Sequence, residues 1–431
     1  MGTTACKACL FNEKGSELAR SSIEYSLITL PGGCVEQDAE VWFKAVRQNI
    51  TEILKNAGGD VKALSFSTQG ISFVPVDETG TPLYNAISWL DTCASCETEV
   101  LEKYFGADGI YDKTGKPVFN QYSLPKLMWF AKNCVKLYEK TYKFMTPPDY
   151  LNFRLTGKTV TDRSMASGTM LYNIKLRRWD EEISDFSGIS IDKLPEVRTA
   201  GECLGTVKPE IAKKLGIPET KEVILGGQDQ KLAAIGAGIA ENICTVSMGT
   251  SSTAITKLVN PAGFFESDAF KEFKRFKCPI FDFDDSRIFA EPSLSTTGAA
   301  IKWLSSILGI SYEEMDTLAE KAAYGANGVR FDANLSESGS ITRLNLASSK
   351  KDIVRALYED ICYGIKEKVG MVGGAKELRV FGGGFKSKIL RRILADIMNV
   401  GVYAADTVET AVLGAAILAS LCQIPAAGIN K

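Results

Sequence analysis

The feature that most constrains the fold of this chain is a layout that occurs twice. Near the start, a Gly-Thr-Thr turn, an apolar run at 3–12 and a second run at 18–30 predict a β-hairpin. In the second half, β-rich runs at 242–248 and 252–258 are divided by another turn of small residues. We therefore predict two lobes of related topology. The length of 431 residues agrees, because a single hydrophobic core rarely grows that large.

The remaining segments alternate between strand and helix patterns, which predicts an α/β fold. Asp38 precedes apolar residues at helical spacing and suits a helix N-cap. The patterns predict strands at 63–68, 72–76, 223–225 and 378–381, and helices at 41–54, 125–135, 232–239, 350–369, 388–398 and 409–420. Because Gly216-Ile217-Pro218 interrupts the pattern, we place the boundary there, between an N-terminal lobe, 1–217, and a C-terminal lobe, 218–431.

The chain contains no histidine, and this absence excludes several classes of chemistry. Ser-His and Cys-His nucleophile pairs, imidazole general bases and histidine-ligated metals all require that side chain. Any proton transfer in this protein must therefore use a carboxylate, a lysine, a tyrosine, a cysteine or water.

The charge balance argues against nucleic acid and membrane partners. The 50 Lys and Arg against 52 Asp and Glu give a formal net charge of −2, so the chain has no overall basic field. No apolar run approaches the roughly 18 residues that a membrane-spanning helix needs. We therefore expect a small-molecule partner, with no nucleic acid and no membrane.

The 11 cysteines are scattered along the chain and follow no recognisable signal peptide. This predicts reduced thiols in a cytoplasmic protein and argues against a disulfide framework. Two pairs have C-x-x-C spacing, Cys6/Cys9 and Cys93/Cys96. The first pair lies in a strand-like run, where residues three apart point to opposite faces. We therefore expect neither a metal site nor redox chemistry at these pairs.

Three glycine-bearing turns are candidate phosphate sites. They are Gly2-Thr3-Thr4 with Lys7, Gly249-Thr250-Ser251, and Gly382-Gly383-Gly384 with Ser387. Small residues let backbone N–H groups approach phosphate oxygens, and the lysine would add a positive charge. The same residues also build ordinary turns, so both interpretations stay open. None of the three is a P-loop or the glycine fingerprint of a dinucleotide site.

Asp229 follows a buried strand pattern and the pair Gly226-Gly227, and it precedes a helix of small residues. A carboxylate in that place would point into a cleft and could take a proton from a hydroxyl group. It would serve equally well as the N-cap of the following helix. The pattern does not decide between these two roles.

Seven segments of the chain form an ordered set of motifs. They are Gly2-Thr3-Thr4-x-x-Lys7, Gly32-Gly33-x-x-Glu36-Gln37-Asp38, Pro125-Lys126-Leu127-x-Trp129, Ala166-Ser167-Gly168-Thr169, Gly226-Gly227-Gln228-Asp229-Gln230, Gly249-Thr250-Ser251 and Gly382-Gly383-Gly384-x-x-Ser387. In order and spacing, along almost the whole chain, this set resembles the FGGY family of carbohydrate kinases. The similarity is greatest to the xylulokinase-like branch of that family.

The resemblance implies a two-lobed, actin-like ATPase fold of the ribonuclease H-like type, with duplicated domains and a ligand cleft between them. It implies an enzyme that uses ATP and Mg²⁺ to transfer the γ-phosphate to a hydroxyl of a ketose, with D-xylulose as the leading candidate. Kinases of fuculose, gluconate, erythritol or glycerol, and a non-catalytic member that only binds nucleotide or sugar, are the alternatives. A homodimer is a further expectation, because members of the family are often dimeric.

By motif position, the resemblance assigns sugar binding and the first phosphate loop to the N-terminal lobe, and ATP binding with the catalytic Asp to the C-terminal lobe. Asp229 would be the general base, with Gln230 beside the sugar. The sugar pocket would also contain Gln69, Gly70, Ile71, Trp89 and Asp91. ATP would be held by Thr3, Thr4, Lys7, Gly249, Thr250, Gly298, Lys302, Gly382, Gly383 and Ser387. The metal ligands stay unknown.

The chain departs from the family pattern in three places. The family opens with a strand that ends in Asp-x-Gly-Thr, whereas the sequence given begins inside that motif, at Met1-Gly2-Thr3. We expect this to reflect where the sequence was taken to begin. Ile71 stands where xylulokinases usually have a histidine, and Cys93 stands where many relatives have an arginine. The sugar is therefore less closely specified than the kinase activity.

Overall fold

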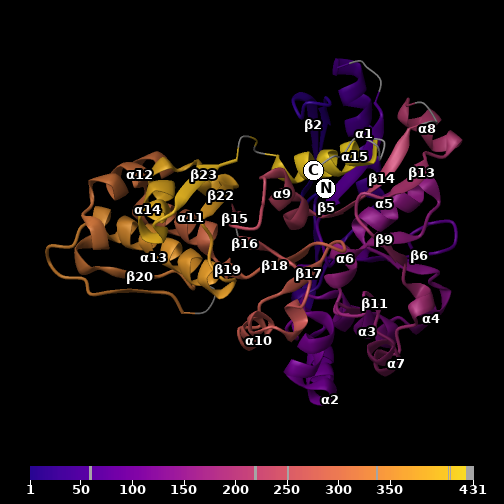
Figure 1. Ribbon diagram of the computed structural model, residues 1–431, viewed down its shortest axis with the longest axis horizontal. Helices are drawn as coiled ribbons and strands as arrows, with labels where there is room; N and C mark the ends of the chain where they lie inside the picture. Colours follow the sequence, from indigo (N-terminus) through magenta and orange to yellow (C-terminus); the bar gives the residue numbers. More distant parts are fainter. Residues whose placement is uncertain are drawn as a thin grey trace. The chain divides into compact units, whose positions relative to one another are not determined.

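The structure is a computed structural model that describes residues 1–57, 61–217, 221–249, 252–335, 338–405, 407 and 409–423. It consists of two compact units, each built from helices and strands (Figure 1). Unit 1 comprises Met1–Gly236, Pro279–Ile288 and Ala411–Lys431, and unit 2 comprises Ala237–Cys278 and Phe289–Thr410. The predicted organisation into two α/β lobes is confirmed.

The two units divide the chain later than the expected boundary at 217/218. β14 (Glu222–Gln228) pairs in parallel with β5 (Ala63–Thr68) and therefore belongs to unit 1, together with α9 (Asp229–Gly236). Nearly all of α15 (Thr410–Gln423) also lies in unit 1, where Gly414 approaches the backbone of α9. Local sequence patterns could not predict either feature, because both join segments that are far apart in the chain.

Unit 1 begins with the predicted hairpin, in which β1 (Ala5–Phe11) and β2 (Glu17–Glu24) pair antiparallel. α1 (Ala39–Ala57) packs on this hairpin through a buried apolar face that includes Trp42 and Val46. The other elements of this unit are β3 (Ile28–Thr29), η1 (Pro31–Gly33), β4 (Val35–Gln37), β6 (Val74–Val76), β7 (Ala86–Ile87), α2 (Ser95–Thr114), α3 (Ser123–Asn133), α4 (Val135–Lys140), β8 (Lys143–Met145), α5 (Pro147–Thr156), β9 (Val160–Asp162), α6 (Arg163–Ser167), β10 (Tyr172–Asn173), β11 (Arg178–Trp179), α7 (Glu181–Ser187), η2 (Ile191–Lys193), β12 (Glu196–Arg198), β13 (Cys203–Thr206), α8 (Pro209–Leu215) and β17 (Ile280–Asp282).

Unit 2 repeats the layout of strand, turn and strand, as the sequence predicts. β15 (Ile243–Met248) and β16 (Ser252–Val259) pair antiparallel, and β15 also pairs in parallel with β22 (Glu377–Phe381). The other elements assigned to this unit are η3 (Phe264–Glu266), α10 (Asp268–Arg275), β18 (Ile288–Ala290), β19 (Ser293–Ser295), α11 (Thr297–Leu308), α12 (Tyr312–Lys321), η4 (Tyr324–Gly328), β20 (Arg330–Asp332), β21 (Ser340–Thr342), α13 (Lys350–Met371), η5 (Gly383–Lys386), α14 (Lys388–Met398) and β23 (Gly401–Ala404).

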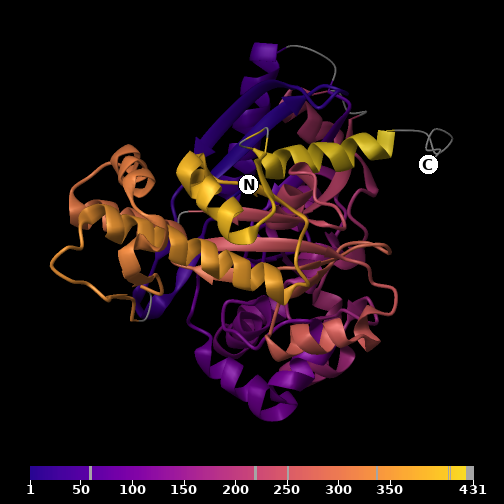
Figure 2. The ribbon, with the colours of Figure 1, turned by 60° about the vertical axis from the view of Figure 1, so that its left-hand side comes forward.

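The helices of unit 2 pack on a sheet in which the strand order runs β18-β16-β15-β22-β23. α13, the long orange helix of Figure 2, contacts α11, α12 and α14 as well as β16. Within the described ranges of both units, no helix combines the length and the apolar content that crossing a membrane requires.

The parallel pairing of β5 and β14 brings the carboxyl ends of these two strands together. Gln228 lies opposite Thr68 in the ladder, so the residues that follow both strands emerge at one edge of the sheet. Between Ile224 and Gly227 the register shifts, and this β-bulge alters the direction of the last residues of β14. In open α/β sheets, ligands bind beyond the carboxyl ends of the strands.

Candidate active site

Polar side chains gather where β5 and β14 end. Gln69 and Gly70 follow β5, while Gln228 ends β14 and Asp229 begins α9. A Cβ atom at Gly70 would lie 2.8 Å from Cγ of Gln228, so only glycine leaves room for that glutamine. The structure therefore brings an expected sugar-pocket residue next to the residue that precedes the expected base.

Three glutamines at these strand ends have carbonyl oxygens with unused hydrogen-bonding capacity. Oε1 of Gln69, of Gln228 and of Gln230 is buried and has no hydrogen-bond partner among the described residues. An unpaired buried acceptor costs about 1–3 kcal/mol, so a native protein seldom keeps one without a reason. A ligand with several hydroxyl groups would satisfy all three oxygens. Gln228 belongs to one of the sequence motifs, but the motif alone predicts no role for its side chain.

Asp229 is the first residue of α9 and is half-buried. Its Oδ1 accepts a hydrogen bond of 2.8 Å from the backbone N–H of Gln230. The carboxylate is therefore held at the N-terminal end of a helix, where the helix dipole favours a negative charge. This position is compatible with both roles expected of Asp229, the base and the residue that starts the helix.

A chain of hydrogen bonds connects the first glycine-bearing turn with the expected sugar pocket. Nε1 of Trp89 donates to Oγ1 of Thr3 at 2.9 Å, and Nε2 of Gln37 donates to the carbonyl oxygen of Thr3 at 2.6 Å. Nε2 of Gln69 in turn donates to Oε1 of Gln37 at 2.7 Å. Gln37 is thus a site residue that the sequence analysis missed, and its only signal was its place in a quoted motif.

The first turn itself is closed by one backbone hydrogen bond and one bond from a tyrosine side chain. The N–H of Gly2 donates to the carbonyl oxygen of Ala5 at 2.8 Å, and the hydroxyl of Tyr25 donates to the carbonyl oxygen of Gly2 at 2.6 Å. Thr4 is exposed in this turn. Lys7 is also exposed, but it lies within β1 rather than in the turn.

Ile71 has a backbone conformation that β-branched residues rarely adopt, with a φ of 71°. Its carbonyl oxygen accepts a hydrogen bond of 2.6 Å from Oγ of Ser123, the first residue of α3. Backbone strain of this kind is found mainly at functional sites, where the surrounding structure holds it. The bond to Ser123 therefore helps to fix the loop that follows Gly70.

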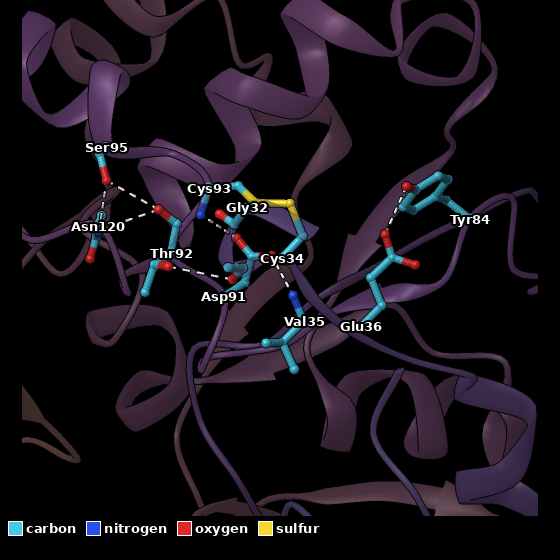
Figure 3. Close-up of a disulfide and its surroundings, with 11 residues drawn as sticks. Gly32, Cys34, Val35, Glu36, Tyr84, Asp91, Thr92, Cys93, Ser95 and Asn120 are labelled. Atoms are coloured by element: carbon cyan, nitrogen blue, oxygen red, sulfur yellow. Dashed lines mark hydrogen bonds between the residues drawn. A yellow bond between two sulfur atoms is a disulfide. The ribbon is translucent and has the colours of Figure 1, made fainter. Parts of the chain in front are cut away.

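Asp91 connects the loop that leads into β4 with the loop that leads into α2. Its buried carboxylate accepts the N–H of Val35 at 2.8 Å through Oδ2 and the N–H of Cys93 at 3.0 Å through Oδ1 (Figure 3). Each oxygen keeps a further lone pair that a ligand hydroxyl could use. Within the described protein, this residue thus shapes the backbone around Trp89.

Lys126 was quoted in a motif but was given no role by the sequence analysis. Its buried Nζ donates to the carbonyl oxygen of Ser88 at 2.7 Å, directly before Trp89. Burial lowers the pKa of Lys126 to about 7, although the negative charge of Asp91 acts in the opposite direction. No spacing rule reveals this contact, because it joins α3 to a turn that is 38 residues away in the sequence.

Replacing Lys126 with methionine is expected to remove a pH dependence of stability that the wild type shows above neutral pH. Because the pKa falls from 10.5 to about 7 on folding, the unfolded chain binds more protons at Lys126 between these values. The penalty for burying the charge is therefore full below pH 7 and declines as the pH rises. As the pH rises, the free energy of unfolding of the wild type should therefore increase by about 1 kcal/mol per pH unit relative to that of Lys126→Met. Urea denaturation of both proteins between about pH 6 and pH 9 measures this increase. It would be refuted if the free energies of unfolding of the two proteins changed with pH by the same amount.

A disulfide joins Cys34 to Cys93, with Cα atoms 5.4 Å apart (Figure 3). The expectation of reduced thiols is therefore wrong for this pair. The two cysteines of the C-x-x-C pair do not act together, because Cys93 bonds to a residue 59 positions earlier and Cys96 is an exposed thiol outside the disulfide. Cys6, Cys134, Cys203, Cys244 and Cys362 are also outside any disulfide in the described ranges.

In unit 2, two glycine turns meet at the carboxyl ends of β15 and β22. Gly382 has a φ of 93°, and a Cβ atom there would lie 2.4 Å from the carbonyl oxygen of Met248. Gly249 follows Met248 and donates its N–H to the carbonyl oxygen of Ser252 at 3.0 Å. Gly383 has open space where a Cβ atom would be. Thr250, an expected phosphate ligand, lies outside the described residues.

The other expected ATP ligands of unit 2 lie on two helices. Gly298 and Lys302 are on α11, with Lys302 exposed and Gly298 in the first turn. The hydroxyl groups of Thr253 and Thr297 are 2.8 Å apart, so the start of α11 lies beside the start of β16. Ser387 accepts the N–H of Leu390 as the N-cap of α14. Its Oγ also donates to Oδ1 of Asp316 at 2.8 Å, a partner that the sequence analysis did not foresee.

The donor atoms at the strand ends fit Mg²⁺, which prefers oxygen ligands in octahedral geometry. The carboxylate of Asp229 is an oxygen donor of this kind. A second cluster does not fit, although the side-chain donor atoms of Cys34, Asp91 and Cys93 lie within 4.8 Å of one another. Its sulfurs are joined in a disulfide, and sulfur ligands suit softer metals.

Known proteins resemble this chain in both sequence and structure. It is 30% identical to the xylulose kinase of Bacillus subtilis strain 168, over 97% of this chain and 86% of that protein. Its structure is similar to ligand-bound xylulose kinase from Lactobacillus acidophilus, with a TM-score of 0.90 and 27% identity, covering 98% of this chain and 88% of that one. The gluconate kinase of Lactobacillus acidophilus gives a TM-score of 0.89 with the same identity and coverage.

Two family models together account for nearly the whole chain. The N-terminal domain of the FGGY family of carbohydrate kinases matches residues 1–236, and the C-terminal domain of that family matches residues 244–422. The resemblance inferred from the motifs and the two-domain, actin-like ATPase fold are confirmed. The chain belongs to the FGGY family of carbohydrate kinases.

Proposed function

We propose that this sugar kinase phosphorylates a ketose, with D-xylulose as its substrate and ATP as the phosphate donor. The observation that carries this proposal is the set of unpaired, buried carbonyl oxygens on Gln69, Gln228 and Gln230 beside Asp229. Such acceptors suit a ligand whose hydroxyl groups donate several hydrogen bonds. The similarity to xylulose kinases over nearly the full length of this chain supports the choice of sugar.

In this proposal, Asp229 is the general base. As the hydroxyl oxygen of the sugar attacks the γ-phosphorus, its proton passes to the carboxylate, the new O–P bond forms and the bond to the ADP oxygen breaks. A carboxylate suits this role in a chain without histidine. Gln230 follows Asp229 and would bind the sugar beside the reacting hydroxyl.

The phosphates would be held by backbone N–H groups and hydroxyls of the small-residue turns. Thr3, Thr4, Gly249 and Thr250 would serve in this way, with Lys7 adding a positive charge. Gly298, Lys302, Gly382, Gly383 and Ser387 would contact the rest of the nucleotide. Mg²⁺, when bound, would neutralise phosphate charge, with Asp229 as an oxygen ligand from the protein.

The test is ADP release from Mg-ATP across a panel of D-xylulose, L-fuculose, gluconate, erythritol and glycerol. We expect D-xylulose to give the highest kcat/KM. A higher value for gluconate would replace the proposed substrate, in line with the similarity to a gluconate kinase. If no sugar stimulates ADP release but ATP and a sugar still raise the melting temperature, the chain is a binding protein and the proposed activity is wrong.

Three further expectations stay predictions. They are a cytoplasmic location, a homodimer and the absence of a nucleic acid partner. The formal net charge of −2 supports the last of these, because it provides no overall attraction to a polyanion.

A further inference from the structure

The disulfide lies in the loops that shape the expected sugar pocket. Cys34 connects η1 to β4, and Cys93 lies between Asp91 and the start of α2. The carboxylate of Asp91 bonds to the N–H of Cys93 and to the N–H of Val35, the neighbour of Cys34 (Figure 3). The covalent bridge and the carboxylate therefore fasten the same two loops side by side.

Each of these loops leads to a residue of the site within a few positions. The first loop continues into β4, where Gln37 bonds to Thr3 and accepts from Gln69. The second loop contains Trp89, whose backbone N–H donates to Oγ of Ser72 at 2.9 Å and whose ring nitrogen donates to Oγ1 of Thr3. If the bridge between the loops is broken, the positions of Gln37 and Trp89 can therefore change, and with them the hydrogen bonds that both residues make to Thr3.

The sulfur atoms are placed where small molecules can reach them. Both cysteines are half-buried, and the neighbouring residues Gly32, Gly33 and Thr92 are exposed. The two cysteines also line a cavity that is bounded in part by Asp91 and Lys126. Thiol–disulfide exchange requires such access for the attacking thiolate.

The reduced form also has a place for its thiol. Sγ of Cys93 lies 3.6 Å from the carbonyl oxygen of Gly32, which can accept an S–H hydrogen bond. The N–H of Thr92 donates to the carbonyl oxygen of Gly33 at 3.2 Å, so the loops remain in contact without the bridge. Breaking the disulfide therefore loosens the loops without unfolding them.

We propose that the bond between Cys34 and Cys93 is a reversible redox tether of the sugar-side loops, and this regulatory role rests on the proposed kinase function. In the reductive direction, two low-molecular-weight thiols supply two electrons and two protons. The first thiolate attacks one sulfur and forms a mixed disulfide, and the second releases it as a small-molecule disulfide. The protein is left with two thiols. A small-molecule disulfide reverses the reaction as the oxidant.

The tether sets how well the sugar pocket is preorganised. With the loops fixed, the sugar binds without ordering them, so the oxidised enzyme should have a sugar KM about tenfold lower than the reduced enzyme. The KM for ATP should change less than the KM for the sugar, because the expected nucleotide ligands Gly382, Gly383 and Ser387 belong to unit 2, whereas the loops bond directly only to Thr3 of the first turn.

The experiment compares oxidised and dithiothreitol-reduced wild type with the variant Cys34→Ser/Cys93→Ser. Cys96→Ser is the matched control, because Cys96 is an exposed thiol three residues after Cys93 that takes no part in the bridge. Mass spectrometry should find a peptide that contains both bridged cysteines in oxidised wild type and in Cys96→Ser. Absence of that peptide would overturn the inference whatever the enzyme does.

Two further readouts separate the tether from the proposed function. Backbone N–H groups at 32–37 and 89–95 should exchange with solvent faster after reduction in wild type and in Cys96→Ser, but the double variant should not respond to the reductant. Equal exchange in both redox states would overturn the tether even if no sugar were phosphorylated. Where a sugar is phosphorylated, an unchanged sugar KM on reduction would overturn the regulatory role and leave the kinase activity intact.

Discussion

Replacing Asp229 with asparagine should lower kcat by about 10²–10⁴-fold while the fold is retained. The amide of asparagine cannot take the proton of the attacking hydroxyl, yet its oxygen can still accept the hydrogen bond that Asp229 receives from Gln230. The KM values for sugar and ATP should change little, because the lost interaction belongs to the transition state. Steady-state ADP release with the preferred sugar measures all three parameters.

A second variant separates the chemical role of Asp229 from its place at the start of a helix. Asp268 is also the first residue of a helix, α10, and its side chain is exposed. Asp268→Asn should leave kcat unchanged. If Asp229 only stabilises the start of α9, then Asp229→Asn should behave like this control, losing about 1 kcal/mol of stability at most. A kcat within a factor of about three of the wild type would rule out the base assignment.

Local patterns in the sequence predicted many elements well. The strand expected at 63–68 and the helix expected at 388–398 coincide with β5 and α14. In both cases the spacing of apolar residues matches the period of the element, so the signal lies within the segment itself. The strand expected at 223–225 continues instead through two glycines to Gln228, because a bulge keeps it paired with β5.

The features that the sequence did not reveal all depend on contacts between distant segments. Cys34 and Cys93 meet only because β4 and the turn after β7 fold together, and their separation of 59 residues gives no local signal of the pairing. The pKa of Lys126 depends on burial beside Ser88 and Asp91, which no local pattern encodes. The motif resemblance supplied the family and the candidate residues, but it did not show which of them bond to one another.

Replacing Gly226 with alanine should be the most destabilising of the substitutions considered, with a loss of about 3 kcal/mol or more. A Cβ atom at Gly226 would lie 1.8 Å from the carbonyl oxygen of Phe66 and 2.7 Å from its carbonyl carbon. These are backbone atoms of β5, so no side-chain rotation can relieve the clash. The two strands would have to separate at the bulge, which lies two residues before Gln228.

Gly370→Ala is the matched control, because a Cβ atom there meets nothing within 4 Å and the residue lies within α13. It should raise stability by about 0.5–1 kcal/mol. Urea denaturation compares the variants. Tryptophan fluorescence follows Gly226→Ala, since four of the five tryptophans, all except Trp303, belong to unit 1, and far-UV circular dichroism follows Gly370→Ala in unit 2. Equal midpoints for Gly226→Ala and wild type would contradict the close approach of β14 to β5. A folded Gly226→Ala protein with a reduced kcat would instead show that the bulge also directs Asp229 towards the reacting hydroxyl, because this glycine contributes no side chain to the site.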